Sequence, residues 1–176
     1  PILSGLVGSE MCIRDRDKDF GPLISDTQRK RVMSYIQTGI DEGAELITGG
    51  KIAGEKGFFI QPTIFTQVHG DMKIAKEEIF GPVLCAQSFG DNDLETIAQQ
   101  ANDTSYGLSG SVWTQDISVA HKMAMLIDAG QVSINWHAAV DPAIPFGGNK
   151  QSGWGREFGK EGLEPYLKTK ATSVIF

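Results

Sequence analysis

The feature that most constrains the fold is a regular alternation of strand and helix patterns in the second half of the chain. Residues 83–89, 110–114 and 131–135 have the apolar composition and length of buried strands. Asn92 and Asp116 are good N-cap residues, and each precedes a segment with apolar side chains at helical spacing. Strand, helix, strand, helix, strand with short turns predicts an α/β fold with a parallel sheet and right-handed crossovers.

A third helix is predicted before these elements. Ser25 or Asp26 can cap it, and Gly43 can end it. Residues 45–48 then read as a short strand, and residues 58–68 as extended chain. The apolar residues that we expect to face the core are, helix by helix, Val32, Ile36 and Ile40; Leu94, Ile97, Ala98 and Ala101; and Ile117, Ala120, Ala124 and Ile127.

Composition limits the classes of function. The chain has 176 residues, 40% of them hydrophobic, which is enough for one packed domain. Its net charge of −6 argues against a nucleic-acid or anionic-membrane surface. Two cysteines, Cys12 and Cys85, form neither a disulfide framework nor a four-ligand metal site, so no metal is expected. No apolar run would span a bilayer and no secretory signal is evident, so a cytoplasmic protein is expected.

Residues 1–19 have no helix or strand period and carry most of the early charge. We interpret the segment from Ser9 to Arg16 as translated adapter sequence rather than evolved protein. The alternative is a variable surface loop.

The segment from Glu77 to Pro82 carries the clearest binding chemistry. Glu78 can present two acceptor oxygens to a sugar diol, and the ring of Phe80 can face a flat ligand. Gly81-Pro82 stiffens the backbone, because proline fixes its own φ and restricts the residue before it. The alternative is a solvated acidic turn ahead of a strand.

These residues belong to several motifs that occur in a fixed order. They are Phe20-Gly21-Pro22-Leu23, Gly57-Phe58-Phe59-Ile60-Gln61-Pro62-Thr63, Glu77-Glu78-Ile79-Phe80-Gly81-Pro82-Val83 and Pro145-Phe146-Gly147-Gly148-Asn149-Lys150-Gln151-Ser152-Gly153. Together they resemble the NAD(P)-dependent aldehyde dehydrogenase family. The resemblance implies that residues 20–169 are the C-terminal part of the catalytic domain of an enzyme that oxidises an aldehyde to a carboxylate with NAD or NADP.

The resemblance also implies roles for single residues around the cofactor. Glu78 matches the residue that accepts hydrogen bonds from the nicotinamide-ribose hydroxyls, and Phe80 matches the aromatic residue beside the nicotinamide. Gln28 matches a position near the same ribose, with an ordinary solvated helix residue as the alternative. Gly81 and Pro82 would support this site.

Further residues match the substrate side of the family's site. Asn135 corresponds to an asparagine that braces the active-site loops. Phe146 corresponds to an aromatic wall of the aldehyde pocket, and His137 and Val140 fall in the variable segment that sets specificity. This segment is similar to that of family members acting on arylacetaldehydes.

The sequence does not contain a complete set of catalytic residues. Neither Cys12 nor Cys85 has the family's Gln-x-Cys nucleophile context, so the nucleophile, the general base and the dinucleotide domain are expected before Pro1. The chain alone is therefore expected to be inactive. Two alternatives stay open: a non-catalytic interaction module on the same fold, and a semialdehyde or acyl-phosphate member of the superfamily.

The tail from Lys170 to Phe176 ends in an apolar strand-like segment with no partner nearby in sequence. In the family this segment joins a partner subunit's sheet, so the resemblance implies a homodimer or homotetramer. Pairing within its own domain is the alternative.

Overall fold

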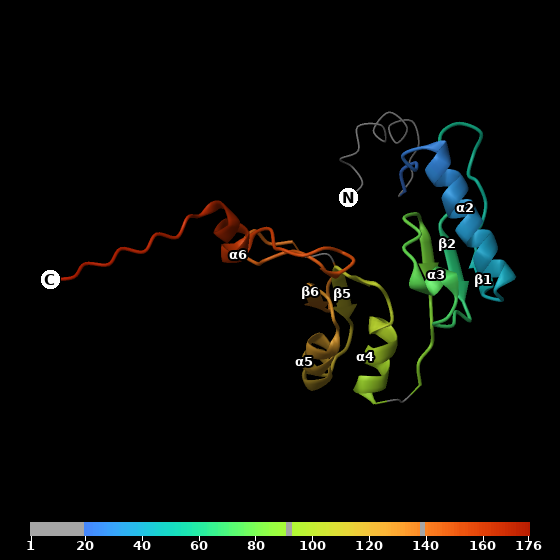
Figure 1. Ribbon diagram of the computed structural model, residues 1–176. Helices are drawn as coiled ribbons and strands as arrows, with labels where there is room; N and C mark the ends of the chain where they lie inside the picture. Colours follow the sequence, from blue (N-terminus) through green and yellow to red (C-terminus); the bar gives the residue numbers. More distant parts are fainter. Residues whose placement is uncertain (1–19, 91–92, 138–139) are drawn as a thin grey trace. The chain divides into compact units, whose positions relative to one another are not determined.

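A computed structural model describes residues 20–90, 93–137 and 140–176 (Figure 1). The chain divides into two compact units, Pro1–Gly90 and Asp91–Phe176. The segment interpreted as adapter sequence and the predicted cap Asn92 both lie outside the described residues.

Unit 1 is built on one long helix and a small mixed sheet. The helix begins where the sequence predicts, because the Ser25 hydroxyl accepts a hydrogen bond from the Gln28 amide at 3.1 Å. The elements in chain order are α2 (Asp26–Asp41), β1 (Glu45–Thr48), β2 (Thr63–Thr66), α3 (Lys73–Lys76) and β3 (Val83–Cys85). Strand β2 is central, antiparallel to β1 and parallel to β3.

The core of unit 1 lies between α2 and this sheet (Figure 1). Phe65 of β2 and Val32 of α2 are both fully buried in it. Ile40, expected in the core, is instead 42% exposed. Gly39 takes the buried position on that turn of α2, where a β-carbon would come within 2.8 Å of the Ile74 side chain. The other buried members of the cluster are Tyr35, Ile36, Ala44, Ile60, Val68, Met72, Ile74 and Ile79.

Unit 2 contains a parallel strand pair covered by two helices. Its elements are α4 (Leu94–Asn102), β4 (Tyr106–Gly107), β5 (Ser109–Val112), α5 (Ile117–Leu126), β6 (Gln131–Ile134), β7 (Asn149–Lys150), α6 (Gly159–Leu163) and the 3-10 helix η2 (Glu164–Tyr166). Strands β5 and β6 are parallel, as predicted, and β4 pairs antiparallel with β7. Helices α4 and α5 lie side by side, with Ala98 and Met123 buried between them and β5 (Figure 1).

The strand pairings are specific to each unit. β3 pairs with β2 within unit 1, a pairing that the sequence did not predict, and β5 pairs with β6 within unit 2. β3 also ends at Cys85 rather than at Phe89. Its partner strand stops at Thr66, since Gln67 turns the chain away with a φ of 54°. Residues 86–90 are exposed.

The caps and buried residues of the unit 2 helices also differ in part from those predicted by the sequence. Asp93 caps α4 by accepting from the Thr96 amide at 2.7 Å, and this bond holds the pKa of Asp93 below its usual value. Asp116 caps α5 as predicted, and this helix ends at Leu126. Ile117, expected in the core, is 67% exposed, whereas Met123, which was not in the predicted set, is buried. In α4, Ala101 is exposed.

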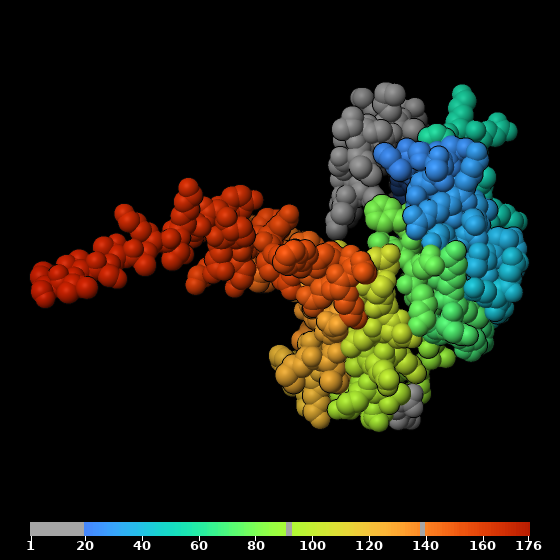
Figure 2. All heavy atoms as spheres, in the orientation of Figure 1, coloured from blue at the N-terminus to red at the C-terminus, as the bar shows by residue number. Residues whose placement is uncertain are grey.

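The tail from Lys170 to Phe176 extends from the end of unit 2 as an isolated segment (Figures 1 and 2). It forms no strand pair with any described residue, and Ile175 and Phe176 are fully exposed. Among residues 20–90, 93–137 and 140–176, no helix is long and apolar enough to span a bilayer.

The core of unit 1 gives the first prediction. Phe65→Ala removes a fully buried ring and should lower the free energy of unfolding by about 3–5 kcal/mol in urea titrations. Phe89→Ala is the matched control, because that ring is 63% exposed, and it should change stability by less than about 0.5 kcal/mol. Equal losses in the two variants would contradict the assigned core.

Candidate functional site

The predicted cofactor residues lie in unit 1, on the turn between α3 and β3. Ile79 is 7% exposed and packs into the core, whereas Glu78 and Phe80 on either side are exposed. Phe80 has a φ of 58°, a left-handed conformation that residues other than glycine rarely adopt. Its ring is 71% exposed. The turn thus presents a carboxylate and an aromatic ring outside the core, with the backbone at Phe80 strained.

Gly81 and Pro82 fix how this turn enters β3. A β-carbon on Gly81 would lie 2.7 Å from the Val32 side chain, so only glycine allows α2 to approach so closely. The carbonyl of Pro82 accepts from the Thr63 amide at 2.9 Å, next to the first β2–β3 register pair. The two residues thus hold the start of β3 against α2 and β2, and their role in supporting a cofactor site stays a prediction.

Gln28 lies beside this turn, but its amide binds the backbone. The Nε2 group donates to the Phe80 carbonyl at 3.0 Å and to the Ile79 carbonyl at 3.3 Å. The structure therefore brings Gln28, Glu78 and Phe80 together. In this arrangement the Gln28 amide group holds the turn, a contact that the sequence did not predict.

The remaining predicted residues lie in unit 2, after β6. Asn135 has a φ of 52°, and its side-chain amide makes two 2.9 Å bonds with the main chain of Thr114: Oδ1 accepts from the Thr114 amide and Nδ2 donates to its carbonyl. This pairing ties together the carboxyl ends of β5 and β6. Beside it is an open hollow of about 550 Å³, lined in part by Trp113 and Ile117.

The three predicted pocket residues have separate contacts. The Nδ1 atom of His137 lies 2.7 Å from the Ser111 hydroxyl. Phe146 exchanges two backbone hydrogen bonds with Glu157, at 2.7 and 2.8 Å. Val140 is 53% exposed. Among the described residues no hydrogen bond joins these three side chains to one another, and residues 138–139 lie outside the described residues.

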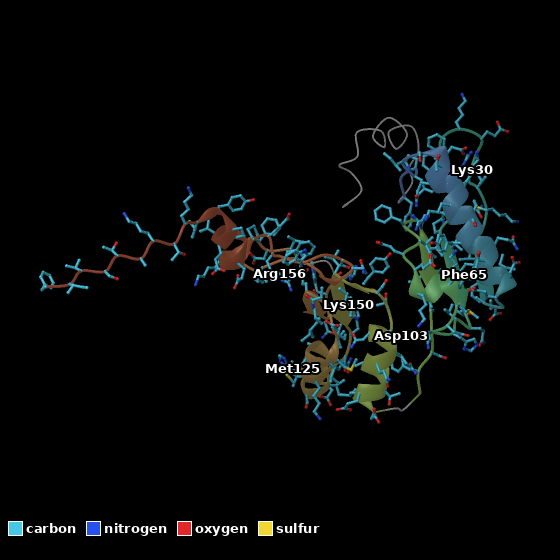
Figure 3. The ribbon with its side chains drawn as sticks, in the orientation of Figure 1. Lys30, Phe65, Asp103, Met125, Lys150 and Arg156 are labelled. Carbon is cyan, nitrogen blue, oxygen red and sulfur yellow. The ribbon has the colours of Figure 1, made fainter. Side chains whose placement is uncertain are left out.

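A polar network that the sequence did not predict holds the glycine-rich loop after Phe146, and Figure 3 labels two of its members, Lys150 and Arg156. Asp128 accepts from the Asn149 amide group at 3.2 Å and pairs with Lys150 at 3.3 Å. The guanidinium of Arg156 donates to the Gly148 carbonyl and to Asn149 Oδ1, both at 2.9 Å. Asp128 lies 21 residues from Asn149, and no period links it to the loop. The only local signal is a run of charged and amide side chains in a glycine-rich loop.

Cys85 is the free cysteine of the described chain. It lies on β3 and is half buried against the core of unit 1. Burial raises the pKa of its thiol, because an apolar environment disfavours the thiolate. A nucleophile needs the opposite shift, so Cys85 has the properties of a structural thiol.

Comparison with known proteins identifies the family. The model of the aldehyde dehydrogenase family matches residues 7–172, and the chain belongs to this family. The mitochondrial aldehyde dehydrogenase of Leishmania tarentolae is 45% identical over 157 residues, which are 89% of this chain and 31% of that protein.

Solved structures agree with this assignment. An aldehyde dehydrogenase of Bacillus cereus in complex with NAD⁺ is 46% identical, with a TM-score of 0.80 over 86% of this chain and 30% of that one. An indole-3-acetaldehyde dehydrogenase of P. syringae, in complex with NAD⁺ and IAA, is 42% identical with a TM-score of 0.83 over 88% of this chain and 31% of that one. These matches confirm the predicted α/β fold class, and the chain spans less than a third of each relative's length.

The environment of Cys85 gives the second prediction. Because the thiol pKa is raised, the thiolate fraction at pH 7.5 is small and iodoacetamide should react with native chain more slowly than with urea-unfolded chain. The rate should rise with pH through a value above that of a free thiol. Mass spectrometry of the Cys85 peptide reads the rate. Faster labelling in the native chain would contradict a structural thiol.

Proposed function

We propose that this chain is part of an oxidoreductase that converts an aldehyde to a carboxylic acid with NAD or NADP. Membership of the aldehyde dehydrogenase family supports the class of reaction. The observation that carries the proposal is the turn between α3 and β3. It keeps a strained backbone at Phe80 while presenting an exposed ring and the exposed carboxylate of Glu78. Strain of this kind is often retained where a ligand is bound.

The side chains on this turn fit the nicotinamide end of such a cofactor. A carboxylate accepts hydrogen bonds from the two hydroxyls of a ribose, and an exposed ring packs beside a flat heterocycle. Glu78 and Phe80 would hold those two groups. Gln28 would act on them through the turn's carbonyls. When bound, the nicotinamide supplies the hydride acceptor for aldehyde oxidation.

The chain by itself would not complete the reaction. Aldehyde oxidation of this type needs a thiolate nucleophile and a general base. Cys85 is a poor nucleophile because burial raises its pKa. The relatives are about three times as long as the matched segment, which leaves room for these groups in the remainder of such an enzyme.

For the substrate, we infer an arylacetaldehyde of the phenylacetaldehyde type. By the sequence match, Phe146 would be an aromatic wall of the aldehyde pocket and Val140 would lie in its variable segment, where a valine leaves more room than a ring. Val140 is 53% exposed among the described residues of unit 2, so its side chain is open to a ligand. One relative of similar fold is named for indole-3-acetaldehyde, an aryl substrate of the same shape class.

The substrate proposal is tested in a chimera in which this chain replaces the matching segment of the Bacillus cereus enzyme. The chimera should reduce NAD⁺ with phenylacetaldehyde, and its kcat/KM should exceed that for acetaldehyde, since ring contact with Phe146 adds about 0.5–1.5 kcal/mol. Val140→Phe should reduce this preference by filling the pocket, and Val140→Ala is the matched control that should keep it.

The outcomes separate the parts of the proposal. An equal or better kcat/KM for acetaldehyde would refute the aryl substrate and leave aldehyde oxidation standing. A folded chimera that oxidises no aldehyde would refute the function. The 176-residue chain alone should produce no NADH with either substrate.

The tail from Lys170 to Phe176 supports a proposal about assembly. It extends from α6 and η2 with exposed apolar side chains and makes no strand pair with described residues of its own chain. We infer that it adds to a sheet of a second copy and so builds a homodimer or homotetramer.

Deleting residues 170–176 from the chimera should therefore reduce its assembly size, because the main-chain hydrogen bonds of an added strand have no substitute elsewhere. Light scattering after gel filtration measures the mass. The matched control replaces Lys168 and Lys170 by Gln and removes charge but no strand. An unchanged mass after the deletion would contradict the proposal.

A further inference from the structure

One face of α2 contacts residues 77–81, the turn between α3 and β3, at several successive positions. Gln28, Arg31, Val32 and Tyr35 lie at positions i, i+3, i+4 and i+7, which form one stripe on a helix. Their partners lie on residues 77–81, and the partners of the three polar side chains run in the opposite order along the chain. The pairs are Gln28 with the Phe80 carbonyl, Arg31 with the Glu78 carbonyl at 3.2 Å, Val32 with Gly81, and Tyr35 with the Glu77 carboxylate at 2.6 Å.

This stripe of α2 binds the carboxylate of Glu77 but not the carboxylate of Glu78. The phenol of Tyr35 donates to Glu77 Oε2, a short charge-assisted bond. The exposed Glu78 side chain makes no hydrogen bond or ion pair with the described residues, whereas its backbone carbonyl accepts from Arg31. Glu77 has φ −109° and ψ 147°, and successive side chains on such extended backbone point to opposite sides. Fixing Glu77 against α2 therefore directs the next side chain away from the helix.

Tyr35 is well placed to hold Glu77 rigidly. The residue is only 7% exposed, so its ring cannot swing away from the core. The guanidinium of Arg31 lies 5.3 Å and the ammonium of Lys73 lies 5.2 Å from the ring centroid. Arg31 also donates to the phenol oxygen at 3.3 Å, so a chain of hydrogen bonds runs from Arg31 through Tyr35 to Glu77.

We propose that Tyr35 is a positioning residue for the cofactor site, because its phenol fixes Glu77 and thereby aims the neighbouring Glu78 carboxylate at the nicotinamide ribose. The claim that Glu78 is aimed at the ribose rests on the proposed function. The claim that the Tyr35 phenol fixes the turn concerns the chain alone.

The first experiment measures the turn in the 176-residue chain. Backbone ¹⁵N order parameters of Glu78 and Phe80 should fall in Tyr35→Phe, which removes one oxygen and keeps the buried ring. Tyr166→Phe is the matched control, since Tyr166 is 85% exposed, and it should leave both values unchanged. Unchanged order parameters in Tyr35→Phe would overturn the proposal, whatever the chimera does.

The second experiment uses the chimera defined above. Tyr35→Phe should lower kcat/KM for NAD⁺ by about threefold to tenfold, in keeping with loss of one charge-assisted hydrogen bond. The KM for the aldehyde should not change. The primary isotope effect with a deuterated aldehyde should rise, because a misaligned acceptor makes hydride transfer slower. In a Glu77→Ala background Tyr35→Phe should have no further effect, since the bond is already lost.

Glu78→Gln separates this inference from the function on which it rests. If Glu78→Gln impairs NAD⁺ use and Tyr35→Phe does not, the positioning role is refuted and the cofactor site stands. If neither variant changes NAD⁺ use in an active chimera, the cofactor assignment itself fails. If Tyr35→Phe impaired the use of NAD⁺ and raised the KM for the aldehyde by the same factor, the variant would be generally destabilised. That result would also count against the proposal.

Discussion

The close approach of α2 to Gly81 is the contact on which the candidate cofactor site depends. Val32 is fully buried against this glycine, and no larger residue fits at position 81. Because the helix comes so near, its polar side chains reach the carbonyls and the carboxylate of residues 77–80. The apolar contact sets the distance, and the hydrogen bonds then set the conformation of a turn that would otherwise relax from its strained value at Phe80.

Local signals in the sequence predicted local structure well. Ser25 and Asp116 cap helices as expected, and the strand at residues 45–48 has the predicted bounds. The family assignment and the α/β class were also accessible, because several ordered motifs carry them. These features depend on neighbouring residues, whose influence does not need the rest of the fold.

The features that the sequence did not predict depend on contacts between residues that are distant in the chain. The parallel pairing of β3 with β2 depends on register pairs such as Thr63 with Val83. The hydrophobic periodicity of the sequence does not encode such pairs. Ile40 has the right spacing for a core residue, but Gly39 occupies the contact. The Gln28 amide binds backbone carbonyls 51 and 52 residues away, which no local pattern predicts, and its place near a ribose stays a prediction. The roles carried over to Glu78, Phe80 and the pocket residues remain predictions.

The conformation of Phe80 places stability and ligand binding in opposition. Glycine is the residue that this backbone geometry favours, so Phe80→Gly would relieve strain and remove an apolar ring from solvent at once. Selection for thermal tolerance or solubility alone would therefore tend to erase the aromatic group. Stability does not account for a phenylalanine at this position, whereas ligand binding would. A stabilisation screen on this chain should therefore hold position 80 fixed.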